Sequence, residues 1–200
     1  MADLVAIYGS PRREGNSSTL LARAVQGVRD TGECSVQEFY VRDQKISPCL
    51  EIYKCQESGE CAIQDDFQKI RDEILSAQGL LLASPIFFYS VSAQVKVLMD
   101  RFQSLWVRKY WIDREQRGGR PFRRRGVFIS AGATSGERLF DGALLSVRYF
   151  FDVLDMELWD SLLCRGLDGA EDVWERPEYL EKAYHLGREL ATSLRLNIHD

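Results

Sequence analysis

Side chains that donate hydrogen bonds are concentrated in residues 9–18, GSPRREGNSS, between an apolar run and a helical pattern. The donors are Ser10, Arg12, Asn16, Ser17 and Ser18. Because the N–H groups at a helix start attract anions, this segment predicts a phosphate site. It is not a Walker A loop, since five residues separate Gly9 from Gly15 and no lysine follows, and it lacks the dinucleotide-binding G-x-G-x-x-G pattern. An ordinary polar loop whose side chains cap the helix is the alternative.

Two later segments have unusual composition for loops. The first contains three consecutive aromatic residues, which cannot all face the core, so at least one is expected to be exposed or to cover a ligand. It comprises Pro85, Ile86, Phe87, Phe88, Tyr89 and Ser90. The second, residues 130–136, consists of small residues that permit close approach of the backbone, among them Ser130, Gly132 and Ala133. The structural alternatives are aromatic packing under neighbouring loops and a plain flexible turn.

The five cysteines do not suggest a disulfide framework, because their number is odd and no export signal is visible. Cys49, Cys55 and Cys61 share one segment, with five residues between neighbours. A structural zinc there would lack a fourth ligand, since His185 and His199 lie near the carboxyl terminus. Two further cysteines, Cys34 and Cys164, lie in strand patterns and are expected in the core.

Apolar runs and helical periodicities alternate along the chain. Strands are predicted at 4–9, 34–40, 79–84, 126–131 and 156–163, and helices at 16–30, 65–75, 92–106, 138–154 and 174–194. Such alternation predicts one doubly wound α/β domain over residues 1–200, with a parallel sheet covered on both faces. Ligands in these folds bind beyond the carboxyl ends of the strands. We therefore expect the segments after the first, third and fourth strands to form the site.

Charge and hydropathy favour a soluble cytoplasmic protein. The net charge of −4 gives no general case for nucleic acid or membrane binding, and the most apolar segment, residues 79–91, is too short to span a bilayer. No signal peptide is visible. The charge is unevenly distributed, because the segment from Trp106 to Arg125 contains eight Lys or Arg and only two acids. We interpret it as an interface or a lid; an electrostatic funnel for NAD(P)H is the alternative.

Three separated motifs together resemble the NADPH-dependent FMN reductase family. They are GSPRREGNSS, a Pro-Cys segment leading to Asp65-Asp66, and SPIFFYSVSAQVKVLMDR, and they cover about the first 135 residues in order. The resemblance implies a flavodoxin-like three-layer sheet with strand order 2-1-3-4-5, FMN as the cofactor, and a homodimer or homotetramer. It implies that the FMN phosphate binds Ser10, Arg12, Asn16, Ser17 and Ser18. It also implies that residues 85–90 and 130–133 lie on either side of the isoalloxazine ring.

Within this family, the chain most resembles the iron–sulfur flavoproteins, but it differs from the cluster-bearing members at one cysteine position. Cluster-bearing relatives carry four cysteines after the second strand, and Ile52 stands at the second of these positions. A [4Fe–4S] cube needs four ligands. We therefore expect reduced thiols and no metal, while a redox-active pair of Cys55 and Cys61 stays open.

The resemblance implies an oxidoreductase that passes electrons from NAD(P)H through FMN to a small acceptor such as a quinone, a flavin or a metal. The flavin carries the chemistry, so no catalytic side chain is assigned. The alternatives are a non-catalytic flavodoxin-type electron carrier and an iron–sulfur flavoprotein.

Overall fold

The sheet of this protein has five parallel strands in the order β2-β1-β3-β4-β5, which confirms the predicted flavodoxin-like topology. The computed structural model describes residues 2–113 and 124–196, with the side chain of the last residue excepted. The strands are β1 (Leu4–Tyr8), β2 (Val36–Tyr40), β3 (Gly79–Pro85), β4 (Arg124–Gly132) and β5 (Met156–Arg165). The strand β1 lies between β2 and β3, because Leu4 pairs with Val36 of β2 and with Gly79 of β3.

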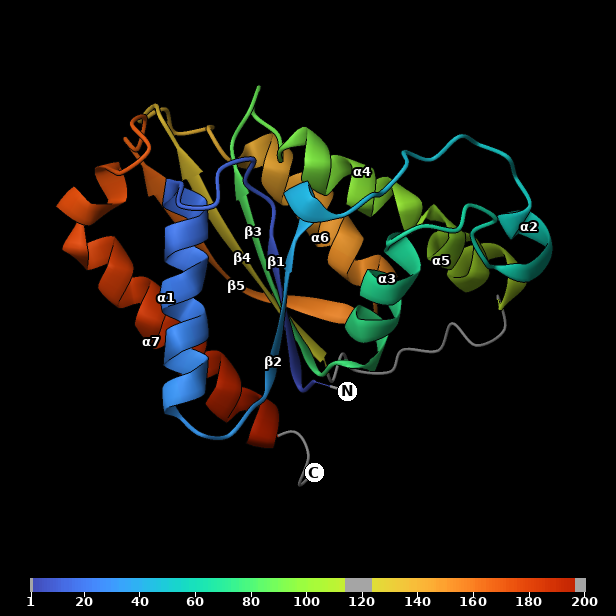
Figure 1. The fold of residues 1–200 in the computed structure, drawn as a ribbon, viewed down its shortest axis with the longest axis horizontal. Helices are drawn as coiled ribbons and strands as arrows, with labels where there is room; N and C mark the ends of the chain where they lie inside the picture. Colours follow the sequence, from blue (N-terminus) through green and yellow to red (C-terminus); the bar gives the residue numbers. More distant parts are fainter. Residues whose placement is uncertain (1, 114–123, 197–200) are drawn as a thin grey trace.

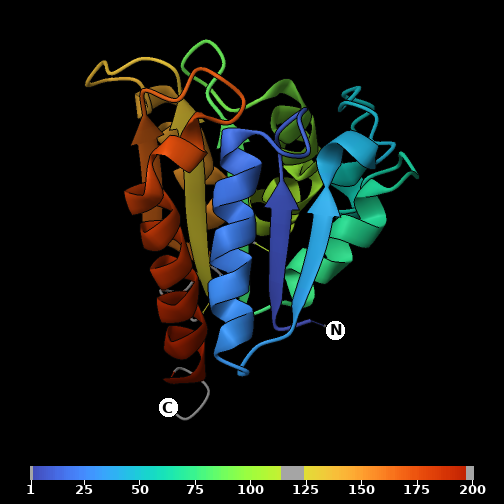
Figure 2. The same cartoon turned by 60° about the vertical axis from the view of Figure 1, so that its left-hand side comes forward.

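Helices cover both faces of the sheet (Figures 1 and 2). One face is covered by α1 (Asn16–Asp30) and α7 (Pro177–Leu196). The other is covered by α3 (Phe67–Ser76), α4 (Ala93–Arg101) and α6 (Asp141–Val153). Short elements complete the described chain: η1 (Val41–Asp43), α2 (Cys55–Ser58), α5 (Gln103–Val107), η2 (Arg108–Ile112) and η4 (Asp172–Glu175).

Two apolar layers form the core, one on each face of the sheet. All five residues of β1 are buried, and they alternate between the layers: Leu4 and Ala6 face α1 and α7, whereas Val5 and Ile7 face α3 and α4. The helices α1 and α7 touch closely, because a Cβ at Gly27 would overlap a carbonyl oxygen of α7 and one at Gly187 would overlap a carbonyl oxygen of α1. Complete burial explains why the strand reads as a continuous apolar run.

The helix predicted at 92–106 is interrupted. It ends as α4 at Arg101, and a tighter turn through Phe102, whose N–H donates to the Met99 carbonyl (3.0 Å), leads into α5. Arg101 and Phe102 are adjacent and both almost fully buried.

Among the described residues, no helix is both long and apolar enough to cross a bilayer.

Candidate functional site

The loops that follow the strands gather at one edge of the sheet (Figures 1 and 2). Buried serines connect three of these loops. The Ser92 hydroxyl donates to the Gly9 carbonyl (2.6 Å), and the Ser92 N–H donates to the Ser84 hydroxyl (2.8 Å). The Ser130 hydroxyl donates to the Ser84 carbonyl (2.8 Å). All three serines have no exposed surface. The ends of β1, β3 and β4 are therefore held in fixed relative positions.

Residues 9–18, which we call the phosphate loop, lead into α1, and none of their side chains caps this helix. Gly15 is the N-cap and makes no side-chain cap, so Asn16, Ser17 and Ser18 are first-turn residues and not caps. The first hydrogen bond of the helix runs from Thr19 N–H to Gly15 O (2.9 Å). The N–H groups of the three residues before Thr19 therefore have no acceptor within the helix, which is the arrangement that binds anions.

Two hydroxyls of the phosphate loop shape its backbone. The Ser10 hydroxyl accepts from the Arg12 N–H (3.1 Å), and the Ser18 hydroxyl donates to the Arg12 carbonyl (3.0 Å). The loop therefore folds around the backbone of Arg12, while the Arg12 side chain is exposed to solvent.

Ser17 is the unusual residue of the loop. Its side-chain oxygen is buried and has no hydrogen-bond partner, and the residue is only 2% exposed. A buried hydroxyl without a partner costs roughly 1–3 kcal/mol relative to a satisfied one. A phosphate oxygen is a strong acceptor for such a donor, and the free N–H groups of the same helical turn add to the attraction. The residues present therefore fit a bound phosphate group.

The amide of Asn16 has a structural partner far along the chain. Its Nδ2 donates to the Gly169 carbonyl (2.7 Å), and its Oδ1 accepts from the Val173 N–H (3.1 Å). Asp172 stabilises the same segment by accepting from the N–H groups of Asp168 (2.9 Å) and Gly169 (2.8 Å). Sequence reasoning missed this segment after β5; its glycines and acids, RGLDGAED, were the only signal. The side-chain amide of Asn16 therefore joins the phosphate loop to the segment after β5.

The segment after β3 ends in a tight turn, residues 87–90, which we call the aromatic turn. Phe87 and Ser90 exchange two backbone hydrogen bonds (3.0 Å each), while Phe88 and Tyr89 have φ of +50° and +60°. The side chains of the three aromatic residues are 48%, 102% and 60% exposed in chain order. The expectation that they cannot all enter the core is confirmed.

The segment after β4 divides into a buried and an exposed part. Ser130 and Gly132 are buried, and the Ser130 hydroxyl aligns β3 with β4, so its side chain does not face the solvent edge. Ala133 begins the exposed part. A Cβ at Gly132 would lie 2.8 Å from Cδ2 of Leu139, so a larger residue here would require the Leu139 side chain to shift.

The three clustered cysteines lie in residues 44–66, which we call the cysteine loop, and line one cavity of about 470 Å³. Apolar walls come from Ile52, Ile63 and Trp111, among other residues. Burial raises the pKa of the Cys55 thiol, and the nearby thiols of Cys49 and Cys61 raise it further. The described residues contain no group of three His, Cys, Asp or Glu arranged to hold a metal ion.

The other two cysteines lie outside the cysteine loop. Cys164 is fully buried in β5, and its burial raises the pKa of the thiol to about 12. Cys34 is half-buried, just before β2, and packs against the same apolar layer. The expectation of core positions is confirmed for Cys164, while Cys34 lies at the margin of the core.

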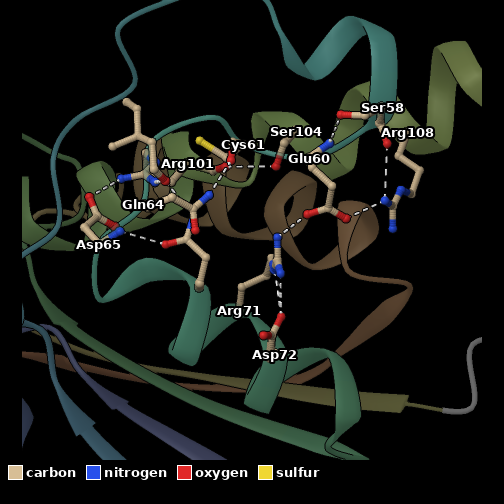
Figure 3. A network of polar contacts seen from close by, with 12 residues as sticks. Ser58, Glu60, Cys61, Gln64, Asp65, Arg71, Asp72, Arg101, Ser104 and Arg108 are labelled. Carbon is tan, nitrogen blue, oxygen red and sulfur yellow. Dashed lines mark hydrogen bonds and ion pairs between the residues drawn. The ribbon is translucent and has the colours of Figure 1, made fainter.

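A buried arginine anchors the cysteine loop to the helical layer (Figure 3). The Arg101 side chain, which is completely buried, donates to the Asp65 carboxylate (2.6 Å) and to the carbonyls of Ser47 (2.9 Å) and Ile63 (2.8 Å). Its guanidinium also lies 4.6 Å from the ring centre of Phe67. Burial raises the pKa of the Asp65 carboxyl, but hydrogen bonds from Arg101 and from the Ser47 and Phe67 amides outweigh it and leave this pKa below its usual value.

A second group of charges lies at the outer end of the same loop (Figure 3). Glu60 accepts from Arg71 of α3 and from Arg108 of η2 (2.5 Å). These partners are partly exposed, in contrast to Arg101.

The described basic residues of the segment from Trp106 to Arg125 have intrachain partners. Lys109 pairs with Asp155 (2.7 Å), Arg124 donates to carbonyls that include Ala77 O (2.8 Å), and Arg125 donates to the Ser193 carbonyl (2.9 Å). These residues have partners within the fold, and the interface, lid and funnel interpretations of the whole segment stay predictions. The other basic residues, Arg114, Arg117, Arg120 and Arg123, lie outside the described residues, as does His199.

Comparisons with known proteins agree with this geometry. Residues 2–158 match the family model for NADPH-dependent FMN reductases. An iron–sulfur flavoprotein of Methanocaldococcus jannaschii is 37% identical over 102 residues, which are 51% of this chain and 52% of that protein. The chain thus spans about half the length of the curated relatives it matches.

Solved structures share the fold at low identity. An NAD(P)H:quinone oxidoreductase from Methanothermobacter marburgensis superposes with a TM-score of 0.72 at 16% identity, over 94% of this chain and 96% of that one. An FMN-dependent NADH-azoreductase of Bacillus anthracis, in complex with FMN, gives a TM-score of 0.64 at 16% identity, over 96% and 98%. Because the family model matches well over half of the chain, the protein belongs to the NADPH-dependent FMN reductase family.

Proposed function

We propose that this protein is an FMN-dependent oxidoreductase that transfers electrons from NAD(P)H to a small acceptor. FMN is the cofactor of the family to which the chain belongs. The observation that carries the proposal is the buried, unpartnered hydroxyl of Ser17 in the first turn of α1. It lies in a loop with free helix N–H groups after the first strand of a doubly wound sheet, where such folds bind ligands.

The phosphate loop would hold the phosphate of FMN. Ser17 and the first-turn N–H groups of α1 supply the donors, and the exposed guanidinium of Arg12 supplies a positive charge. Ser10 and Ser18 shape the backbone around Arg12. Asn16 contributes its N–H, while its side chain holds the segment after β5.

The isoalloxazine ring would lie between the segments after β3 and β4. Pro85 to Ser90 offer aromatic surface and backbone groups, while Gly132 and Ala133 permit close approach from the other side. Ser130 acts indirectly, by aligning the two strands. When bound, FMN accepts a hydride and donates electrons, so these residues need only bind, orient and exclude water.

An iron–sulfur flavoprotein is the alternative that the relatives favour. Against it, Ile52 occupies the second ligand position and is 50% exposed, and only three thiols line the cavity. A [4Fe–4S] cluster requires a fourth ligand. We therefore propose a protein with reduced thiols in this loop.

Self-association is also part of the proposal. The outer face of α6 exposes Leu145 (74%) and Tyr149 (57%), and the Tyr149 hydroxyl accepts from the Trp106 indole (3.0 Å). Exposed aromatic and aliphatic side chains of this kind favour protein interfaces. We assign this face to contact with a second copy.

Three measurements on the purified protein test the proposal. Heat-released flavin should be FMN and not FAD by chromatography, and NADPH or NADH should bleach the flavin absorbance rapidly in stopped flow. Iron and acid-labile sulfide should stay far below four per chain after anaerobic preparation. A colourless protein that takes up no FMN would refute the central claim, and a flavin that neither nucleotide reduces would favour an electron carrier.

A further inference from the structure

The aromatic turn has a backbone conformation that its residues disfavour. Two hydrogen bonds between Phe87 and Ser90, with positive φ at both central residues, define a two-residue turn of type I′. Sequences that form this turn favour Asn-Gly, because a Cβ clashes with the backbone at positive φ. Phe88 and Tyr89 are large aromatic residues at both positions, so the turn is strained.

Packing within the described chain does not offset this strain. The Phe88 side chain is fully exposed and that of Tyr89 is 60% exposed. The nearby chain instead makes room for the turn: a Cβ at Gly142, in the first turn of α6, would lie 2.6 Å from the Tyr89 carbonyl oxygen. Strained residues persist where function requires them, so the two exposed rings call for a functional explanation.

The turn lies beside the proposed flavin site. The Ile86 N–H donates to the Ala131 carbonyl (2.9 Å), which joins the segments after β3 and β4, and Ser92 joins the same segment to the Gly9 carbonyl. None of the six residues from Pro85 to Ser90 carries a charge. A molecule that binds against the turn itself meets uncharged aromatic faces, which suit a neutral planar ring.

We propose that Phe88 and Tyr89 form the binding platform that selects neutral planar aromatic electron acceptors, of the quinone class, over other acceptors. This inference rests on the proposed function and specifies its substrate. The overall reaction balances as NAD(P)H plus a proton plus quinone giving NAD(P)⁺ plus hydroquinone: the nicotinamide supplies a hydride, and solvent supplies the proton. The turn takes part only by holding the acceptor ring beside the flavin.

Two double variants separate the rings from the strain. Phe88→Asn/Tyr89→Gly removes both rings and installs the dipeptide that the turn prefers. The matched control, Phe88→Ala/Tyr89→Ala, removes the rings but keeps a Cβ at each positive φ. The melting temperature should rise by about 2–4 °C in the Asn-Gly variant and not in the Ala-Ala variant. A rise of equal size in both, or none in either, would show that the turn is not strained.

Acceptor binding is measured on the oxidised FMN-loaded protein without reductant. Titration with menadione, followed by flavin absorbance, should give a dissociation constant at least about tenfold higher in both variants than in wild type. With NADPH present, kcat/KM for menadione should fall by a similar factor, and by several-fold more than kcat/KM for ferricyanide, a non-planar anion, measured on the same FMN-loaded variants. Equal losses for the two acceptors would overturn the proposal.

Two further outcomes are informative. Sedimentation velocity should give the same oligomeric state for wild type and both variants; dissociation of the variants would mean that the turn contacts a second copy, and the acceptor proposal would be wrong. If NADPH fails to reduce the flavin, the proposed function fails while the menadione titration still reports on the platform. If NADPH reduces the flavin but wild type binds no menadione, only this inference fails.

Discussion

The phosphate loop and the cysteine loop both follow strands of the sheet, yet they are held in different ways. The phosphate loop is short; the hydroxyls of Ser10 and Ser18 bind the backbone of Arg12 within the loop, while Asn16 binds the segment after β5. The cysteine loop is long and depends on Arg101, a residue at the far end of α4. The first loop is defined mainly by local sequence and the second mainly by a tertiary contact.

Two buried polar atoms without partners differ in their surroundings: one belongs to the phosphate loop, and the other to the arginine that anchors the cysteine loop. In the cysteine loop region this atom is Arg101 Nε, but the guanidinium already makes three hydrogen bonds and contacts the ring of Phe67. In the phosphate loop it is the Ser17 oxygen, which has no such compensation. This difference supports the proposal that the phosphate loop holds a phosphate group.

Replacement of Arg101 by Met should have the largest effect on stability. It removes the guanidinium from two carbonyls and from the Asp65 carboxylate, which keeps the Ser47 and Phe67 amides as donors. Removal of one partner of a buried ion pair costs about 3–5 kcal/mol. Urea denaturation measures the loss. Arg101→Lys, which keeps the charge but not the fork geometry, should lose less. FMN affinity of the folded variants should change less than about threefold, and a larger change would show that the two loops are coupled.

Replacement of Ser17 by Ala should have the largest effect on FMN binding. A hydrogen bond to a charged group contributes about 1.5–3 kcal/mol, so the dissociation constant for FMN should rise roughly 10- to 100-fold. Stability of the flavin-free protein should not fall, because the hydroxyl has no partner to lose. Riboflavin, which lacks the phosphate, should be little affected.

The comparison variant for this test is Asn16→Ala. Because its side chain tethers the segment after β5, it should weaken FMN and riboflavin by similar factors. A loss specific to FMN in Asn16→Ala would instead make its amide a direct phosphate ligand.

Acid should weaken the cysteine loop through Asp65. The pKa of this carboxyl is lowered in the folded protein from a reference value of 3.8, so its contribution is fully present well above that value and is lost as the pH falls through the folded pKa. The difference in unfolding free energy between wild type and Asp65→Asn should be constant from about pH 5.5 to 7 and shrink below the reference value. A difference that stays constant to the acid limit of folding would contradict this assignment.

Replacement of Arg71 by Met should have the smallest effect. Arg71 binds Glu60 and Asp72, but both carboxylates are largely exposed, and exposed ion pairs contribute about 0–1 kcal/mol. Urea denaturation should show a loss in this range. A loss as large as that of Arg101→Met would mean that the outer end of the cysteine loop, and not its base, anchors it.

Most of the regular structure was predictable from local patterns. Every predicted strand is present, with ends that differ by up to two residues; β4, for example, begins at Arg124 and not at Gly126. Burial of β1 on both faces produces the continuous apolar run from which it was predicted. The aromatic turn was also predictable as exposed, because three adjacent aromatic residues exceed what one side of a strand can bury.

The errors all concern contacts between residues distant in sequence. The Asn16 amide binds Gly169 and Val173, more than 150 residues away, and no local pattern indicates this. The helix α4 ends at Arg101, whose side chain binds Asp65 of the cysteine loop, 36 residues earlier in the chain. The described arginines of the basic segment bind carbonyls at helix ends that only the folded chain brings near them.

The sequence by itself determined the order of strands and helices, the edge at which the loops meet and the family to which the chain belongs. These depend on periodicity, turn residues and motifs, which act over a few residues. Only the tertiary structure decided which donors of the phosphate loop are free: it engaged the Asn16 amide elsewhere and left the Ser17 hydroxyl without a partner. The physical reason is that hydrogen-bond satisfaction is a property of the completed packing, because each buried donor is paired or left unpaired only when distant segments come together.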